Sequence, residues 1–163
     1  MRLNDERVPT AEGPGGRTDA TDDHLIVSTI ILGGTEETRL LLRGLVRLNR
    51  HRVLAETATA DQLVMANPSD PSSVLILVAD GDSDEWPHEL ATARQRQPTL
   101  RTILLVPERT PELIERARRM GVKGVLNRPF AIRDLVASVE AVARGEDILD
   151  RVPEGRRPTT GQP

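Results

Sequence analysis

Acidic side chains and one arginine follow apolar segments of this chain, where they could bind a cation or each other. Asp80 and Asp82 come after the apolar run 74–79, and Arg128 stands before Pro129. Hard divalent cations prefer carboxylate oxygens, which makes Asp80 and Asp82 weak candidates in a sequence that otherwise predicts no metal site. The acidic stretch is also typical of a solvated turn that precedes a helix. Arg128 could have a catalytic role, or it could serve only the structure by forming an ion pair with Asp80 or Asp82.

A glycine pair, Gly33 and Gly34, separates the apolar run 25–32 from a helix-like segment that carries Glu36 and Glu37. The helix start could present backbone amides to an anion, which permits a small-ligand-binding hypothesis. The motif lacks the full dinucleotide pattern and the lysine of a phosphate-binding loop, and the two glutamates would repel a phosphate. Glu36 and Glu37 are also expected to point away from any metal at the strand end.

The three histidines, His24, His51 and His88, have neither metal-ligand spacing nor a paired nucleophile, and the chain has no cysteine. We expect them at the surface or at an element edge. The sequence therefore predicts neither an enzyme nor a cofactor.

Strand-like and helix-like periodicities alternate along the chain. The strands and helices that they predict must position the residues named above. Strands are expected at 25–32, 52–56, 74–79, 102–106 and 124–127. Helices are expected after the cap Thr35 and at 59–66, 84–95, 111–120 and 132–143. The first helix is expected to bury Leu40, Leu41, Leu45 and Leu48.

Five successive strand–helix units predict an α/β fold with a parallel sheet and right-handed crossovers. The expected topology is a flavodoxin-like, doubly wound (βα)5 arrangement with strand order 2-1-3-4-5, whose site lies at the carboxyl ends of strands one and three. The domain is predicted to span residues 24–147. The polar, Gly- and Pro-containing ends, 1–23 and 148–163, are expected to be disordered because they cannot bury enough apolar surface.

Composition excludes several classes of partner. A formal net charge of -3 provides no basic field, so no direct nucleic-acid contact is expected. The longest apolar run, 74–79, is far below membrane-spanning length, and the first residues lack the apolar segment of a signal peptide. We therefore expect a cytoplasmic protein with no membrane contact.

The segment from Gly121 to Phe130 contains a glycine helix stop, a short buried strand, a basic residue before proline and an aromatic residue. It resembles the last third of response-regulator receiver domains of bacterial two-component systems. Residues 116–124 and 141–146 are similar to the ends of the fourth and fifth receiver helices, and the resemblance covers about residues 25–146. The remaining segment is too short and polar for the DNA-binding domain that often follows, so the resemblance is to a stand-alone receiver.

The chain departs from the receiver pattern at the residues that perform phosphotransfer. A receiver uses acids after strand one to hold Mg²⁺, an aspartate ending strand three, a hydroxyl ending strand four and a lysine ending strand five. Those positions fall on Gly33 and Gly34, Val78, Val106 and Arg128. A two-residue shift would instead make Asp80 the acceptor. Val125 stands where many receivers carry a switch aromatic, and the resemblance implies a cis peptide bond before Pro129.

Three hypotheses remain open. The first is an atypical pseudo-receiver that signals through protein contacts without aspartate phosphorylation. The second is a phosphorelay receiver in which Asp80 accepts phosphate with Mg²⁺, and the third is a small-ligand-binding regulatory domain. In receivers the surface of helix four, strand five and helix five commonly binds a partner or a second copy, although mixed charges there can serve solvation alone. The candidate residues of this surface are Glu112, Glu115, Arg116, Arg119, Arg133, Asp134, Glu140 and Arg144.

Overall fold

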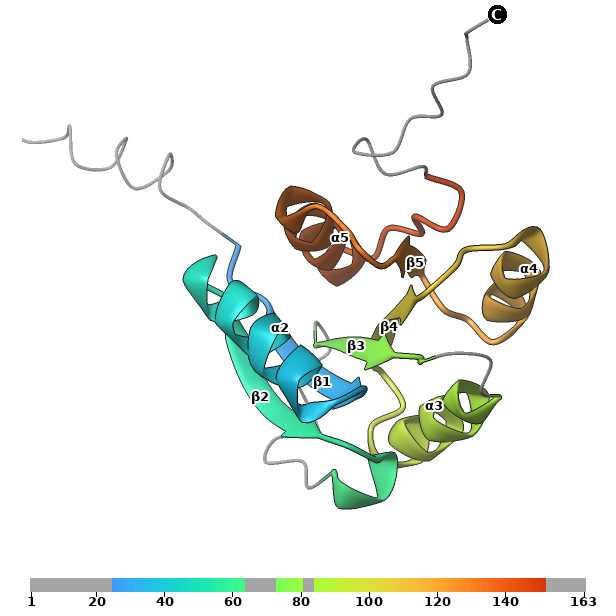
Figure 1. Ribbon diagram of the computed structural model, residues 1–163, viewed down its shortest axis with the longest axis horizontal. Helices are drawn as coiled ribbons and strands as arrows, with labels where there is room; N and C mark the ends of the chain where they lie inside the picture. The colour runs from blue at the N-terminus through green and yellow to red at the C-terminus, as the bar shows by residue number, and fades with distance from the viewer. Residues whose placement is uncertain (1–24, 64–72, 81–83, 152–163) are drawn as a thin grey trace, which may run out of the picture.

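A computed structural model describes residues 25–63, 73–80 and 84–151 of this 163-residue chain. Five parallel strands form one sheet in the order β2-β1-β3-β4-β5, which confirms the predicted topology (Figure 1). The strands are β1 Ser28–Gly33, β2 Arg52–Thr57, β3 Val74–Val78, β4 Arg101–Val106 and β5 Gly124–Asn127. His24, Asp82, the predicted end segment 1–23 and residues 152–163 of the predicted end segment 148–163 lie outside the described residues.

Helices α2 and α5 cover one face of the sheet, and α3 and α4 cover the other (Figure 1). Their bounds are α2 Glu36–Leu48, α3 Glu85–Arg96, α4 Pro111–Arg119 and α5 Ile132–Ala143. In place of the helix expected at 59–66 there is a 3₁₀ turn, η1 Ala60–Gln62, and residues 64–66 lie outside the described part. None of the helices in the described ranges is long and apolar enough to cross a membrane.

The central strand β3 is buried along its whole length, because helices cover both faces of a parallel sheet. Its alternate side chains enter two separate cores. Ile76 and Val78 pack with Ile31 beneath α2 and α5, whereas Leu75 and Leu77 pack beneath α3 and α4. The side chain of Val78 and those of its neighbours in β3 therefore lie on opposite faces of the sheet. The carboxyl ends of the parallel strands lie together at one edge of the sheet.

Helix α2 begins where the sequence predicts, with the Thr35 hydroxyl accepting a hydrogen bond from the Thr38 amide at 3.1 Å. The predicted inner stripe was wrong. The helix buries Leu42 and Val46 and half-buries Leu45, while it leaves Leu40, Leu41 and Leu48 exposed. The run of leucines offered several helical phases, and the one adopted turns Arg39 and Arg43 toward Glu56 on β2.

His51 is buried, contrary to the prediction of a surface or edge position, whereas His88 is exposed. The Val27 amide donates to His51 Nδ1 at 3.1 Å, which leaves the proton of a neutral ring on Nε2. Nε2 lies 3.0 Å from Glu140 Oε2 on α5. This ring therefore links the start of β1 to α5.

The chain continues to pack after α5. Ile148 is 7% exposed and Leu149 is fully buried, and the Ile148 amide donates to the Lys123 carbonyl at 2.7 Å. Arg109 donates to the carbonyls of Leu149 and Arg151. These contacts extend the packed part of the domain beyond the predicted boundary at residue 147.

Candidate functional site

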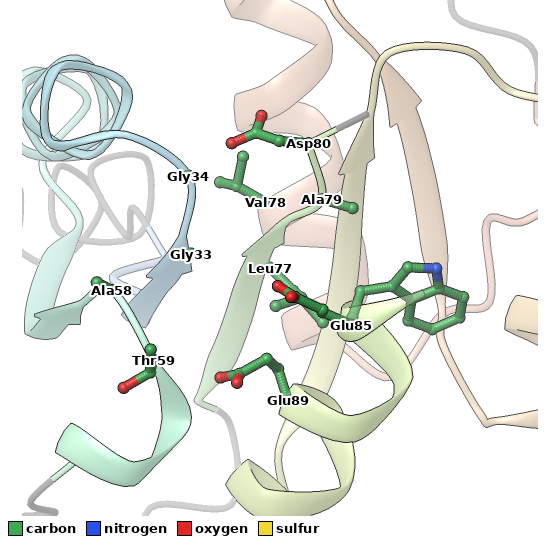
Figure 2. A pocket seen from close by; sticks show the side chains of 11 residues that line it. Gly33, Gly34, Ala58, Thr59, Leu77, Val78, Ala79, Asp80, Glu85 and Glu89 are labelled. Atoms are coloured by element: carbon green, nitrogen blue, oxygen red, sulfur yellow. The ribbon is translucent and has the colours of Figure 1, made fainter. Parts of the chain in front are cut away.

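A cavity of about 290 Å³ opens at the carboxyl ends of β1 and β3 (Figure 2). The loop after β2 and the first turns of α3 complete its wall. Its lining residues are Gly33, Gly34, Ala58, Thr59, Leu77, Val78, Ala79, Asp80, Glu85, Trp86 and Glu89. The sequence predicted a site at these two strand ends because doubly wound sheets bind ligands there.

Gly33 and Gly34 have φ angles of +91° and +71°, a conformation that residues with a side chain rarely adopt. A Cβ on Gly33 would lie 2.6 Å from the Val78 carbonyl oxygen, and one on Gly34 would lie 2.9 Å from Val78 Cγ1. Arg39 Nη1 also donates to the Gly34 carbonyl at 2.6 Å. The backbone at Gly33 and Gly34 therefore leaves no space for a side chain, and no carboxylate stands at the end of β1.

Val78 pairs with Gly33 in the sheet register, and its side chain points toward Gly34 (Figure 2). It is 5% exposed and belongs to the core beneath α2 and α5. A valine carries no oxygen that could accept a phosphoryl group. The residue beside the glycine pair is therefore a packing residue.

Asp80 lies two residues beyond Val78 and forms an ion pair with Arg128, whose Nη2 is 2.5 Å from Asp80 Oδ1. The Asp80 side chain is 48% exposed. The Arg128 amide donates to the Val106 carbonyl at 2.8 Å, which holds Arg128 at the end of β5, and the Arg128–Pro129 peptide bond is cis. Arg128 therefore lies on the side of Asp80 away from η1 and outside the cavity lining, and Pro129 is exposed.

Val106 and Val125 are buried beneath α3 and α4 in the same core cluster as Trp86. The end of β4 thus presents no hydroxyl toward the cavity. Neither residue lines it, although the sequence placed Val106 among the pocket residues.

Two glutamates of α3, Glu85 and Glu89, line the cavity but were not predicted. Glu89 Oε2 accepts a hydrogen bond from the Ala60 amide at 2.5 Å and so caps η1. Their four-residue spacing, which puts both on one helix face, was the available signal. Glu36 and Glu37 are exposed at the start of α2, outside the cavity lining. In the described part of the chain no three acidic or histidine side chains form a group able to hold a metal ion.

The predicted partner surface is partly engaged within the molecule. Arg116 of α4 pairs with Asp84 at 2.8 Å and lies over the Trp86 ring, and Glu140 of α5 contacts His51. The other candidates on α4 are Glu112, Glu115 and Arg119, and those at α5 are Arg133, Asp134 and Arg144.

No protein-family model and no curated protein matches the sequence. Solved structures do match. The RcsB response regulator of Salmonella typhimurium has a TM-score of 0.61 at 17% identity, covering 79% of this chain and 64% of that one. Its isolated receiver domain, solved with phosphomimetic BeF₃⁻, has a TM-score of 0.59 at 16% identity, covering 76% of this chain and 92% of that one.

A pilus assembly-related protein from Burkholderia pseudomallei has a TM-score of 0.60 at 18% identity, covering 74% of this chain and 92% of that one. A CheY-like receiver domain protein from Methanospirillum hungatei has a TM-score of 0.56 at 14% identity, covering 74% of this chain and 96% of that one. The chain therefore has the fold of response-regulator receiver domains. Identities this low establish no more than the fold.

Proposed function

We propose that this chain is an atypical receiver domain that regulates a signalling process through protein contacts and does not accept phosphate. One observation carries the proposal: the buried Val78 side chain, packed against the glycine pair, stands beside the strand end where a receiver needs its acidic cluster. Phosphotransfer depends on a metal that neutralises the phosphoryl oxygens. Among the described residues no three acidic or histidine side chains form a group that could hold one.

The alternative is a phosphorelay receiver in which Asp80 is the acceptor and Mg²⁺ is bound with Asp82 or Asp84, the latter of which pairs with Arg116. The ion pair between Asp80 and Arg128 favours this alternative to the extent that it brings a basic group to the carboxylate. The contact involves only Asp80 Oδ1, so it does not by itself exclude attack by the other carboxylate oxygen. Asp82 lies outside the described residues.

A small-ligand-binding role has less support from the cavity. Asp80, Glu85 and Glu89 give its wall an acidic character, which disfavours phosphate-bearing ligands. If nucleotides and metabolites raise the melting temperature in a thermal-shift screen, this third hypothesis gains over the first.

We further propose a cytoplasmic role with a protein partner, without direct nucleic-acid or membrane contact and without catalysis of its own. The similar structures include a DNA-interacting response regulator and a pilus assembly-related protein, so the fold is compatible with different outputs.

The experiment is phosphorylation by a small phosphodonor with Mg²⁺, read by intact-protein mass spectrometry beside a phosphorylatable receiver domain. We expect no acid-labile mass increase on this chain. A stoichiometric adduct that the Asp80→Asn variant lacks would overturn the proposal and establish the phosphorelay alternative.

A further inference from the structure

The outward face of α2 is apolar. Leu40, Leu41 and Leu48 are 54%, 59% and 79% exposed. Gly44 lies between them, and a Cβ built there would meet no atom within 4 Å. Because residues four apart are neighbours on a helix surface, Leu40, Gly44 and Leu48 form one ridge with a gap at its middle. Two large side chains with a glycine between them leave room for another helix to approach closely.

The surface first expected to bind a partner is different. On α4 and α5, within the described residues, Ile132 is the large hydrophobic side chain that is strongly exposed. Apart from Pro111 and Ala137, the other exposed residues of these helices are charged, and several charged side chains there pair within the molecule. Interface centres are depleted of charged residues, so α2 is the better docking face.

Charge along α2 is arranged in opposite signs at its two ends. Glu36 and Glu37 are exposed at the start, and Arg47 and Arg50 are exposed at and just after the end. Arg39 and Arg43 do not disturb this pattern, because Glu56 pairs with both of them. A helix that is acidic at one end and basic at the other is complementary to a reversed copy of itself.

The spacing agrees with that pairing. Leu40 lies four residues before Gly44 and Leu48, the last residue of the helix, lies four residues after it, which at 1.5 Å per residue is about 6 Å along the axis on either side. Glu37 lies about 10 Å before Gly44, and Arg50 follows the end of the helix with φ +68°. Two antiparallel helices that cross at Gly44 therefore bring the acidic end of each to the basic end of the other. Leu40 of one copy then packs beside Leu48 of the other.

We propose that α2 is a self-association surface on which a second copy of this chain docks antiparallel across Gly44. The interface is isologous, so one two-fold axis closes the dimer. The proposal deepens, and rests on, the proposed function, because it names the partner and the face that a receiver acting through protein contacts would use. A single helix pair is a small interface, and we expect a dimer with a dissociation constant in roughly the micromolar range.

The test is sedimentation equilibrium of the full chain over a wide concentration range. Leu40→Glu introduces a charge into the apolar ridge, and Gly44→Gln fills the gap with a good helix-forming residue. Each is expected to weaken the dimer by about tenfold or more. Ile132→Glu is the matched control, since its side chain is 51% exposed on α5, and it should leave the dimer unchanged. Far-ultraviolet circular dichroism and melting curves verify that every variant is folded.

Charge exchange tests the antiparallel orientation. The variant Glu36→Arg/Glu37→Arg makes both helix ends basic, and Arg47→Glu/Arg50→Glu makes both ends acidic. Each alone should be more monomeric than the natural chain, whereas an equimolar mixture should form a heterodimer. Persistent monomers in the mixture would contradict this pairing.

A natural chain that stays monomeric at every concentration would overturn the proposal. A dimer that Ile132→Glu disrupts and Leu40→Glu does not would overturn it too, by moving the interface to α5. Both results leave the proposed function intact if the phosphodonor still gives no adduct. An adduct would instead overturn the proposed function, whatever the oligomeric state.

Discussion

Gly33 sets how closely β1 approaches the end of β3. We expect Gly33→Ala to destabilise the fold for two reasons. A positive φ costs a residue with a side chain about 1–2 kcal/mol, and the new methyl group would meet the Val78 carbonyl, which costs roughly 1–3 kcal/mol more. Urea unfolding measures the change in the free energy of unfolding.

Gly145→Ala is the matched control, because Gly145 has φ +93° and its Cβ would meet no atom within 4 Å. It should show the conformational cost of about 1–2 kcal/mol alone. Equal losses in the two variants would mean that the strand ends can separate to admit a side chain.

The candidate site was only partly predictable at the scale of residues. The glycine pair, Val78 and Arg128 follow from counting along the sequence, but two loop residues more or fewer would have exchanged Val78 for Asp80. In the sheet Val78 pairs with Gly33, and Asp80 lies two residues further on beside Arg128. Glu89 was missed because its contact with Ala60 joins segments 29 residues apart, a distance that local periodicity does not address.

Among the elements, those with unambiguous boundary signals were predicted best. Strand β5 and helix α5 have the predicted bounds, since glycine, proline and a clear apolar period delimit them. Helix α2 had a correctly predicted start and a wrong buried face. Leucine occurs at positions 40, 41, 42, 45 and 48, so several faces of this helix could be buried. The face that is buried also brings Arg39 and Arg43 to Glu56 on β2, a contact between distant segments that the local sequence does not predict.

The link between β1 and α5 through His51 gives a prediction at this scale. His51→Ala removes the acceptor of the buried Val27 amide and the contact to Glu140, so we expect the free energy of unfolding to fall by about 2–3 kcal/mol. His88→Ala, at an exposed position on α3, should change it by less than about 0.5 kcal/mol. Thermal and urea melts compare the two. Similar small effects would show that the His51 ring is dispensable.

For the molecule as a whole, the sequence predicted the sheet order and the layers but ended the domain too early. A chain ending at Asp147 would lose the buried side chains of Ile148 and Leu149, each worth about 1.5–3 kcal/mol. We expect it to be less stable than a chain ending at Arg151 by roughly 3 kcal/mol or more. Parallel urea titrations of the two truncated chains measure the difference, and identical midpoints would contradict the role given to this segment.

The packing of residues 148–151 was not predicted because only two apolar residues, Ile148 and Leu149, indicate it. Two apolar residues among charged ones have no period, and their burial depends on Gly124, where a Cβ would lie 2.9 Å from Ile148. Hydrogen bonds from Arg151 and then from Arg144 also hold the pKa of Glu146 below its usual range, so an ion network ties both ends of the segment together.

The close approach of the glycine pair to Val78 bears on whether a carboxylate could be introduced at this edge of the sheet. An aspartate placed at position 33 or 34 would need space that the Val78 backbone and side chain now occupy, and it would need a backbone conformation other than the present one. An acceptor carboxylate at position 78 alone would have no metal partner. An acid at the end of β1 therefore requires the strand ends to move apart, so no single substitution at position 33, 34 or 78 supplies both an acceptor and a metal ligand in the present fold.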